Sequence, residues 1–596
     1  MTRQSSKLLL VGWLLILGAS SFGQGNADAN LFNIERSQET YVPGEVLVKF
    51  KSQLGIRSVE GLLSDKGVKA QKSYESIGVV KYTMDGPSAR SVDGDKMAEL
   101  LDELRSDPNV EYAEPNYYVY ALETTPNDSR FGEQWALKNT GQSGGTNDAD
   151  IDGTDAWDTQ RGSQSVIVGV IDTGIDYNHP DLQANIWKNP GESGNGKETN
   201  GVDDDGNGFV DDWRGWDFAN NDNDPFDDNA HGTHCAGIIG AVGNNNRGVS
   251  GINWNVSLVG LKFLTGSGSG STSDAIDAIL YAVQMNIPIL SNSWGGGGFS
   301  QALADAVEAA NQAGILFVAA AGNENNNNDS NPNYPSNYTS ENVLAVASSD
   351  RRDIRSSFSN YGKTTVDLAA PGSDILSTTP NNNYQSFSGT SMATPYAAGT
   401  AALVKAQYPN INHIALKYRL MGSVDFASDF VDRTVTEGRV NAAKALSGNP
   451  LITTEQHEDT NDNQTPYTIT AFIVDDGSIT NATLNYSLSG SGSGTGAVPM
   501  TANGVSYTAN IPPQAIGTTI EYSVKATDNA NNSTTGRMLA FDVTGTPPPG
   551  NGGGGLCGAS AMTLNSGHLG LDLFATVFFN LMIFIGLPYF LFKRRK

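Results

Sequence analysis

Three short glycine-rich segments carry residues whose types could do nucleophilic chemistry. Asp172 lies in VIDTGIDYNHPDL, His231 opens HGTHCAG, and Ser391 lies in SFSGTSMATP. Nucleophilic acyl transfer needs a hydroxyl, a base that takes its proton, and an acid that orients and stabilises that base. One residue of each kind occurs, in the order Asp, His, Ser. The sequence therefore predicts a catalytic apparatus built from these three residues.

Each segment taken alone also has an ordinary structural interpretation. A strand-end aspartate is usually a cap, and a Gly-Thr-Ser turn is commonly a helix N-cap. His231 and His234 could be metal ligands, but a pair with this spacing needs a third ligand, and no HExxH-type partner is present. The three segments together, in this order, favour catalysis over these separate interpretations.

The segments that must position these residues alternate between apolar strands and helical patterns. Short apolar runs rich in β-branched residues predict strands at 165–174, 257–264, 287–295, 314–323 and 342–349. Helices are predicted between them, at 272–285 and 300–314. This alternation predicts an α/β fold, a parallel sheet with helices on both faces. In such sheets ligands bind outside the carboxyl ends of the strands, which is where Asp172 lies.

The segments DTGID, HGTHCAG and GTSMATP resemble the three signatures of the subtilisin-like serine proteases, the subtilase family. The resemblance extends over about residues 130 to 447. It implies a subtilisin-like fold and peptide-bond hydrolysis through an acyl-enzyme. Ser391 would be the nucleophile, His231 the general base, and Asp172 the residue that orients the imidazole. Asn323 in AAAGNEN and the Ser391 backbone N–H would stabilise the oxyanion.

Substrate-binding and structural roles also follow from the resemblance. SNSWGGG (291–297) resembles the edge strand that pairs with an extended peptide, which implies substrate binding by Ser293, Trp294 and Gly295. One wall of the specificity pocket would be formed by Ala320, Ala321 and Gly322, with Glu324 and Asn333 toward its bottom. His234 is expected to be structural, and Cys235 a buried cysteine without a catalytic role.

The resemblance further implies calcium (Ca²⁺) as a cofactor. Asp181 in HPDL matches a calcium-ligating aspartate of the family, and the loop VGNNNRGVSG (242–251) resembles its partner, with Asn245 as a ligand. The loop carries one residue more than the usual form, so Asn244 is an alternative ligand.

A second candidate calcium segment is DDDGNGFVDDWRGWDFANNDNDPFDD (203–228), which holds ten aspartates and one arginine. Its opening follows an EF-hand loop, but Arg214 stands at the twelfth position, where glutamate would complete that loop. Carboxylates at this density repel one another without a cation. The alternative is a solvated acidic loop. The predicted ligands are Asp203, Asp205, Asn207, Asp222, Asp224 and Asp227.

The charge and cysteine content restrict the class of protein. The chain has 64 Asp and Glu against 37 Lys and Arg, a formal net charge of -27. This balance argues against nucleic acid as a partner, because phosphate binding needs a basic face. The two cysteines, Cys235 and Cys557, lie far apart, so a disulfide framework is excluded.

Both ends of the chain carry apolar segments of the targeting type. Residues 1–23 have the layout of a secretory signal, with basic residues before LLLVGWLLILG and small residues after it. Residues 573–592 carry no charge and are long enough to span a bilayer, and the KRRK that follows is expected to stay on the cytoplasmic side. The layout resembles bacterial three-part sorting tails, so a processing enzyme is an expected partner. Cys557 is either a processing or lipidation point or an ordinary residue. We expect an exported protein, extracellular or associated with the cell envelope, with 573–592 as a candidate anchor.

These patterns divide the chain into six parts. The region at 41–120 resembles the subtilase propeptide, an intramolecular inhibitor and folding aid, and cleavage is expected between about Val119 and Thr125. Alternating short strands near the C-terminus predict an all-β sandwich of the immunoglobulin or fibronectin type. The predicted parts are a signal peptide (1–23), a small α+β propeptide (41–120), a peptidase domain (126–447), the sandwich (452–545), a Pro/Gly linker (546–556) and a transmembrane or sorting tail (557–596).

Two functions from different classes are compatible with this organisation. The first is an exported, calcium-stabilised serine endopeptidase made as a zymogen and acting on proteins or peptides. The second is a surface-anchored binding protein whose β-sandwich carries the function. An inactive scaffold is expected to lose a triad or oxyanion residue, and none is lost here, so the sequence favours the endopeptidase.

Overall fold

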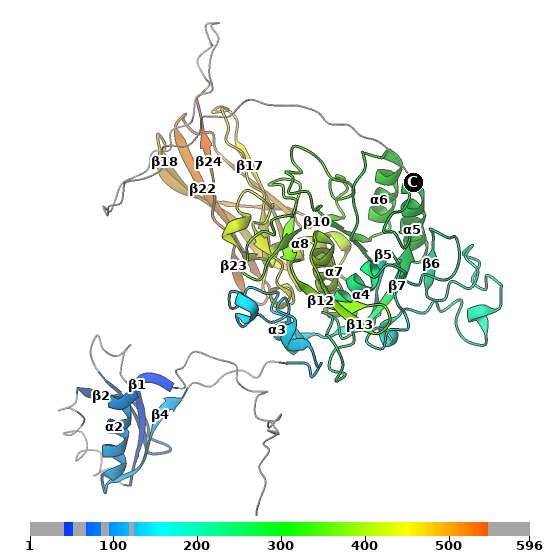
Figure 1. The fold of residues 1–596 in the computed structure, drawn as a ribbon. Coiled ribbons are helices and arrows are strands. Elements are labelled where there is room, and N and C mark those ends of the chain that lie inside the picture. The colour runs from blue at the N-terminus through cyan, green and yellow to red at the C-terminus, as the bar shows by residue number, and fades with distance from the viewer. Residues whose placement is uncertain (1–40, 52–62, 64–66, 85–93, 118–123, 546–596) are drawn as a thin grey trace, which may run out of the picture. The chain divides into compact units, whose positions relative to one another are not determined.

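The computed structural model describes residues 41–51, 63, 67–84, 94–117 and 124–545 (Figure 1). The predicted signal peptide, linker and tail, with Cys557 and the apolar span, lie outside these residues, as does most of the predicted propeptide cleavage region. None of the helices in the described ranges combines the length and the apolar character that crossing a membrane requires.

The first described region is a four-stranded antiparallel sheet with one helix packed on it. The strand order is β2-β3-β1-β4. Alternate residues of β1, Val46 and Val48, are buried against Leu100 and Leu104 of the helix, as the period of two in a strand dictates. This is the small α+β unit that the sequence predicts. Its elements are β1 (Tyr41–Phe50), β2 (Val68–Tyr74), β3 (Val79–Met84), α2 (Gly94–Ser106) and β4 (Val110–Tyr117).

A nine-stranded sheet carries the candidate catalytic residues. Its order is β14-β15-β11-β10-β9-β8-β5-β7-β6, and its neighbouring strands are parallel except for the pair β14 and β15. The predicted strands correspond to β5, β7, β8, β9 and β10. In chain order the strands are β5 (Gly162–Asp172), β6 (Gly215–Asp217), β7 (Asn255–Lys262), β8 (Ile289–Asn292), β9 (Leu316–Ala320), β10 (Val343–Ser349), β11 (Leu368–Pro371), β14 (Asp425–Phe426) and β15 (Gly438–Arg439).

Helices cover both faces of this sheet (Figure 1). In β5, Val168 and Val170 pack in one core with residues of α4 and α7, whereas Ile171 packs in a second core with residues of α5 and α6. The predicted α/β class is therefore confirmed. The helices are α3 (Gly153–Thr159), α4 (His231–Gly240), α5 (Thr272–Gln284), α6 (Gln301–Gln312), α7 (Thr390–Gln407), α8 (His413–Gly422) and α9 (Ala442–Ala445), with a hairpin of β12 (Ile375–Thr379) and β13 (Asn383–Phe387) beside α4.

Two antiparallel sheets that share one apolar core form the C-terminal part of the described chain. The core brings Ile469 and Ile511 of one sheet against Leu484 and Tyr522 of the other, so the predicted all-β region is confirmed. Sequence reasoning missed β16, β19, β20 and β23, which have three to six residues each and little apolar periodicity. The strands are β16 (Leu451–Thr454), β17 (Tyr467–Val474), β18 (Ile479–Gly490), β19 (Gly494–Pro499), β20 (Thr501–Asn503), β21 (Ser506–Ile511), β22 (Thr518–Asp528), β23 (Ser533–Thr535) and β24 (Leu539–Val543).

Candidate active site

Asp172 and His231 meet at the carboxyl end of the nine-stranded sheet. Asp172 is the last residue of β5 and His231 the first of α4. Asp172 Oδ1 lies 2.7 Å from His231 Nδ1, and the aspartate is fully buried while the imidazole is partly exposed. The carboxylate therefore accepts the Nδ1–H of the ring, which leaves Nε2 free to act as a base.

The surroundings of His231 also set its acidity. Burial by itself would lower the pKa of His231, but the charge of Asp172 and the hydrogen bond to its carboxylate outweigh burial, so the pKa lies above its ordinary value. The neutral ring that can take a proton is consequently populated only as the pH rises through this raised pKa.

Ser391 lines the same groove as His231, but its hydroxyl is hydrogen-bonded to Ser293 and not to His231. It is the second residue of α7, and its hydroxyl donates to the Ser293 carbonyl at 3.1 Å, while the Ser293 hydroxyl donates to the Ser391 carbonyl at 2.9 Å. Among the described residues no hydrogen bond joins Ser391 to His231. Both residues line the same groove of about 620 Å³. The Ser391 hydroxyl therefore has to turn from Ser293 toward the imidazole before a proton can pass.

Asn323 lies beside the start of α7, where Thr390 holds its side chain. The Thr390 N–H and hydroxyl donate to Asn323 Oδ1 at 2.8 Å and 3.1 Å. The Nδ2 group faces Gly389 and makes no hydrogen bond within the described part of the chain. Because the first N–H groups of a helix have no intrahelical acceptor, the Ser391 N–H is available as well. Two donors beside a nucleophile can stabilise a developing oxyanion.

The predicted substrate-binding residues fall into two groups. Ser293, Trp294 and Gly295 line the groove with His231 and Ser391. The other group, Ala320, Ala321 and Gly322, does not line that groove; both alanines are buried.

Gly322 has a conformational reason to be glycine. Its φ is +111°, and a Cβ there would collide with the side-chain amide of Asn360. Glu324 Oε2 and Asn333 Nδ2 approach the same position, within 2.7 Å and 3.0 Å of where that Cβ would stand. The structure therefore gathers Gly322, Glu324 and Asn333 in one place.

His234 and Cys235 are buried behind the site. His234 Nε2 lies 2.9 Å and 3.0 Å from the carbonyl oxygens of Ile375 and Gln385, and its ring stacks on Phe387. Burial lowers the pKa of His234 to about 3, so the ring stays neutral and supports the β12–β13 hairpin. The Cys235 thiol lies 3.4 Å from the Ser391 carbonyl, and burial raises its pKa, which keeps it from being a nucleophile.

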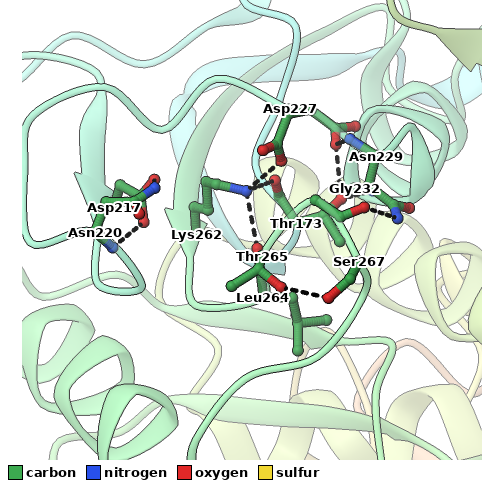
Figure 2. Close-up of polar contacts among 12 residues, drawn as sticks. Thr173, Asp217, Asn220, Asp227, Asn229, Gly232, Lys262, Leu264, Thr265 and Ser267 are labelled. Atoms are coloured by element: carbon green, nitrogen blue, oxygen red, sulfur yellow. Dashed lines mark hydrogen bonds and ion pairs between the residues drawn. The ribbon is translucent and has the colours of Figure 1, made fainter.

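Lys262 supports the site and was missed by sequence reasoning. It ends β7, is 2% exposed, and its Nζ donates to the carbonyl oxygens of Thr173 and Leu264 at 2.7 Å and 2.8 Å (Figure 2). The same nitrogen lies 2.8 Å from Asp228 Oδ1. Lys262 thus links Thr173, which follows Asp172 in the chain, to Asp228, which precedes helix α4. A lysine that interrupts the apolar run SLVGLKFL is the signal that could have revealed it.

Asp227 has a structural role at the start of α4. Its Oδ1 accepts the Thr173 hydroxyl at 2.8 Å, and its Oδ2 accepts the N–H and the hydroxyl of Thr233 at 2.8 Å and 2.6 Å. Thr173 in turn accepts the Gly232 N–H at 2.9 Å (Figure 2). This predicted metal ligand therefore links the strand end that bears Asp172 to the helix that bears His231.

Asp181 lies in a buried group of oxygen atoms that includes a residue absent from the sequence prediction. Asp181 Oδ1 accepts the Asn245 side-chain amide at 2.6 Å. Asp128 Oδ2 accepts the Asn244 N–H at 2.6 Å, while its buried Oδ1 has no partner among the described residues. Burial raises the pKa of Asp128 to about 6, and the charge of Asp181 adds to the shift. Two buried carboxylates without a described cationic partner fit a hard cation such as calcium.

Among the six predicted ligands of the acidic segment, Asp203, Asp205 and Asn207 lie together, because the Asn207 N–H donates to a carboxylate oxygen of each aspartate. Asp224 accepts the Tyr177 hydroxyl at 2.6 Å, and Asp222 accepts the Asp224 N–H at 3.0 Å. The carboxylate of Asp203 accepts the backbone N–H groups of Gly206, Asn207 and Gly208. Asp205 belongs to a cluster with two residues outside the predicted set, Glu192 and Asp212. The Asp203 carboxylate thus stabilises the turn at residues 203–208 through hydrogen bonds to its backbone.

An aspartate–imidazole pair, a serine at the start of a helix and N–H donors beside it are the components that a serine hydrolase site on an α/β sheet requires. Residues 163–464 match the subtilase family, and residues 29–116 match the fervidolysin N-terminal prodomain. The chain belongs to the subtilase family.

Two relatives match most of their own length. The chain is 36% identical over 420 residues to the thermophilic serine proteinase of Bacillus sp. (strain AK1), covering 70% of this chain and 90% of that protein. It is 39% identical over 299 residues to thermitase of Thermoactinomyces vulgaris, covering 50% and 93%. The protein is therefore a subtilisin-like serine endopeptidase synthesised as a zymogen, as the sequence resemblance implies.

Proposed function

We propose that Ser391, His231 and Asp172 carry out peptide-bond hydrolysis, with Asn323 as an oxyanion donor. The observation that carries this assignment is the 2.7 Å contact of Asp172 Oδ1 with His231 Nδ1 in a groove that also contains Ser391. The aspartate orients the ring and stabilises its charged form, so that Nε2 faces the nucleophile.

The reaction then proceeds in two halves. Ser391 Oγ attacks the scissile carbonyl and His231 Nε2 takes its proton, which forms a tetrahedral oxyanion held by Asn323 Nδ2 and the Ser391 N–H. The C–N bond breaks as His231 returns the proton to the leaving amine. Water, deprotonated by His231, then hydrolyses the acyl-enzyme and restores the Ser391 hydroxyl.

The substrate is an extended peptide. Its backbone pairs with the chain at Ser293–Gly295 as an added strand. The residue before the cleaved bond would lie against Gly322, one wall of the specificity pocket, while Ala320 and Ala321, which are buried, would support this wall from behind. Glu324, beside Gly322, gives this pocket a negative charge.

Calcium is the proposed cofactor at the first metal site. Asp128, Asp181 and Asn245 would hold it, and when bound it would neutralise two buried carboxylates and tie residue 128 to the 242–251 loop. The acidic segment at 203–228 is a second calcium-binding region, in which Asp222 and Asp224 each keep one carboxylate oxygen that accepts no hydrogen bond from a described residue. The oxygens of the other four predicted ligands, Asp203, Asp205, Asn207 and Asp227, already accept hydrogen bonds from backbone, amide or hydroxyl donors.

The surrounding parts of the chain serve export and latency. The prodomain acts as an intramolecular inhibitor until it is cleaved near residues 119–125. The protein is exported through residues 1–23, and the tail at 557–596 either anchors it through 573–592 or is removed by a sorting enzyme.

The test is covalent labelling of the nucleophile. The purified protein is treated with a sulfonyl fluoride, and the modified peptide is identified by mass spectrometry. The label should fall on Ser391 and abolish hydrolysis of casein, and Ser391→Ala should be inactive, unlabelled and uncleaved in a host without other proteases. Casein hydrolysis by Ser391→Ala at the parent rate would overturn the assignment.

A further inference from the structure

Asn360 is a buried asparagine that lies outside the predicted set of site residues. It belongs to the segment between β10 and β11, and only 1% of its surface is exposed. Its hydrogen-bond partners come from another part of the chain, the segment that follows β9 and contains Asn323. The polar groups of Asn360 are therefore directed at the segment that carries the proposed oxyanion donor.

The peptide groups on both sides of Asn323 are held by Asn360. The Asn360 N–H donates to the Gly322 carbonyl at 2.9 Å, which fixes the peptide group before Asn323. Asn360 Oδ1 accepts the Glu324 N–H at 2.9 Å, which fixes the peptide group after it. A residue has only two soft backbone dihedrals, and these set the orientation of its two flanking peptide groups. The two hydrogen bonds together thus define the backbone from which the Asn323 side chain projects.

The other contacts of the Asn360 side chain settle which of its atoms matters. Oδ1 also accepts the Asn326 N–H at 2.9 Å, and Nδ2 donates to Glu324 Oε2 at 2.9 Å. Because two backbone N–H groups point at the same atom, that atom has to be the amide oxygen. The oxygen therefore restrains the backbone, whereas the nitrogen contacts only an exposed side chain.

The Asn323 segment is restrained from its other side by the start of α7. The Gly322 N–H donates to the Thr390 hydroxyl at 3.3 Å, and the Thr390 N–H donates to Asn323 Oδ1 at 2.8 Å. Packing at Gly322 is close, since a Cβ there would stand 2.3 Å from Asn360 Nδ2. Asn323 is thus held between the helix that carries Ser391 and the loop that carries Asn360.

We infer that Asn360 is a positioning residue for the oxyanion donor, because its side-chain oxygen fixes the backbone at Asn323 and so keeps Asn323 Nδ2 beside Ser391. The inference rests on the proposed function, in which Asn323 stabilises the oxyanion. Asn360 does not line the groove, so it acts through Asn323. A donor stabilises developing charge best when it is already in place, and a displacement of about 1 Å can lower a rate by about 10². Removing the oxygen should therefore lower kcat and leave substrate binding nearly unchanged.

The test compares Asn360→Ala, which removes this oxygen, with Asn360→Asp, which keeps an acceptor at the same place. In the aspartate variant the exposed Glu324 side chain can turn its carboxylate into solvent. Asn342→Ala is the matched control, because Asn342 is an equally buried asparagine that donates to the Val307 and Ile315 carbonyls and does not line the groove. Each variant is expressed as the full chain. Hydrolysis of a short chromogenic peptide is measured per active site, as counted by sulfonyl fluoride titration, and Tm is measured alongside.

Asn360→Ala should lower kcat by about tenfold, less than the roughly 10²–10³ expected for Asn323→Ala, with KM changed by less than about twofold. Asn360→Asp should restore kcat to within about threefold of the parent, since the acceptor is back. Asn342→Ala should lower Tm and leave kcat unchanged. In the Asn323→Ala background, Asn360→Ala should change kcat by less than about twofold, because no donor is left to position. If Asn360→Ala does not fold, Asn360→Ser replaces it, since the shorter hydroxyl cannot reach both N–H groups.

A parent-like kcat in Asn360→Ala, an equal loss in Asn360→Asp, or the same loss with and without Asn323 would each overturn the inference. A merely structural role would lower Tm as in Asn342→Ala and leave kcat per active site intact. Failure of the proposed function is recognised separately, as a parent-like kcat in Asn323→Ala or as a parent enzyme that sulfonyl fluoride does not label at Ser391.

Discussion

Replacing Asn323 with alanine tests the oxyanion assignment most directly. The side chain is exposed, but its Oδ1 accepts the N–H and the hydroxyl of buried Thr390, so the substitution should lower the free energy of unfolding by about 1–3 kcal/mol without preventing folding. It removes one of the two donors that lie beside Ser391, and such a donor contributes about 2.7–4 kcal/mol to the transition state, or about 10²–10³ in kcat. KM should change little, since the bond forms mainly after the carbonyl becomes an oxyanion.

Thr390 offers a graded version of the same experiment. Its hydroxyl donates to Asn323 Oδ1 at 3.1 Å, while its N–H holds the same oxygen at 2.8 Å. Thr390→Val removes the hydroxyl and keeps the N–H, so the amide should lose about 1 kcal/mol of support, or about fivefold in kcat. Thr390→Ser keeps the hydroxyl and serves as the control, with kcat near that of the parent.

The assay is steady-state hydrolysis of a short chromogenic peptide, with active enzyme counted by sulfonyl fluoride titration. The expected order of kcat is parent, Thr390→Ser, Thr390→Val, then Asn323→Ala. If Asn323→Ala keeps kcat within about threefold of the parent while remaining folded, Asn323 is not an oxyanion donor and the geometric reasoning fails.

Three further predictions follow from the same contacts. Asp172→Asn should lower kcat by about 10⁴. Because the aspartate raises the pKa of His231, the substitution should also move the acid limb of the plot of kcat/KM against pH to lower pH. An acid limb that does not shift would argue against the Asp172–His231 pair. Lys262→Met should destabilise the protein by about 2–4 kcal/mol in urea unfolding, since it leaves the buried Thr173 carbonyl and the partly buried Leu264 carbonyl without donors, whereas the exposed Lys188→Met should be neutral. A calcium concentration of a hundred times Kd should stabilise the protein by about 2.7 kcal/mol per site, so EDTA should lower Tm; a Tm that responds equally to EDTA in Asp181→Asn and in the parent would exclude that site.

Local sequence patterns determined the main elements of this fold. Apolar β-branched runs located β5, β7, β8, β9 and β10, because buried parallel strands are apolar on both faces. Helices α5 and α6 follow from the period of their apolar residues. Short glycine-rich motifs at strand and helix ends located Asp172, His231 and Ser391, because close backbone packing there restricts the residue types that fit.

The acidic segment shows where sequence reasoning reached its limit. Composition correctly singled out a region crowded with aspartates, but it could not say which oxygens remain free. Asp203 and Asp227 look like ligands by type, yet backbone and hydroxyl donors occupy their carboxylates. Whether a carboxylate is free depends on donors that only the folded loop brings near.

Contacts between distant segments were decided by the tertiary structure alone. Asp128 comes next to the loop at Asn244, 116 residues away, and Lys262 reaches Thr173, 89 residues away. Glu192 meets Asp212 only after the loop has folded back on β6. The energies of burial and hydrogen bonding arise from contacts between residues far apart in the chain, and no local sequence pattern encodes such contacts. The sequence therefore identified the chemistry of the site. The tertiary structure decided which residues support it.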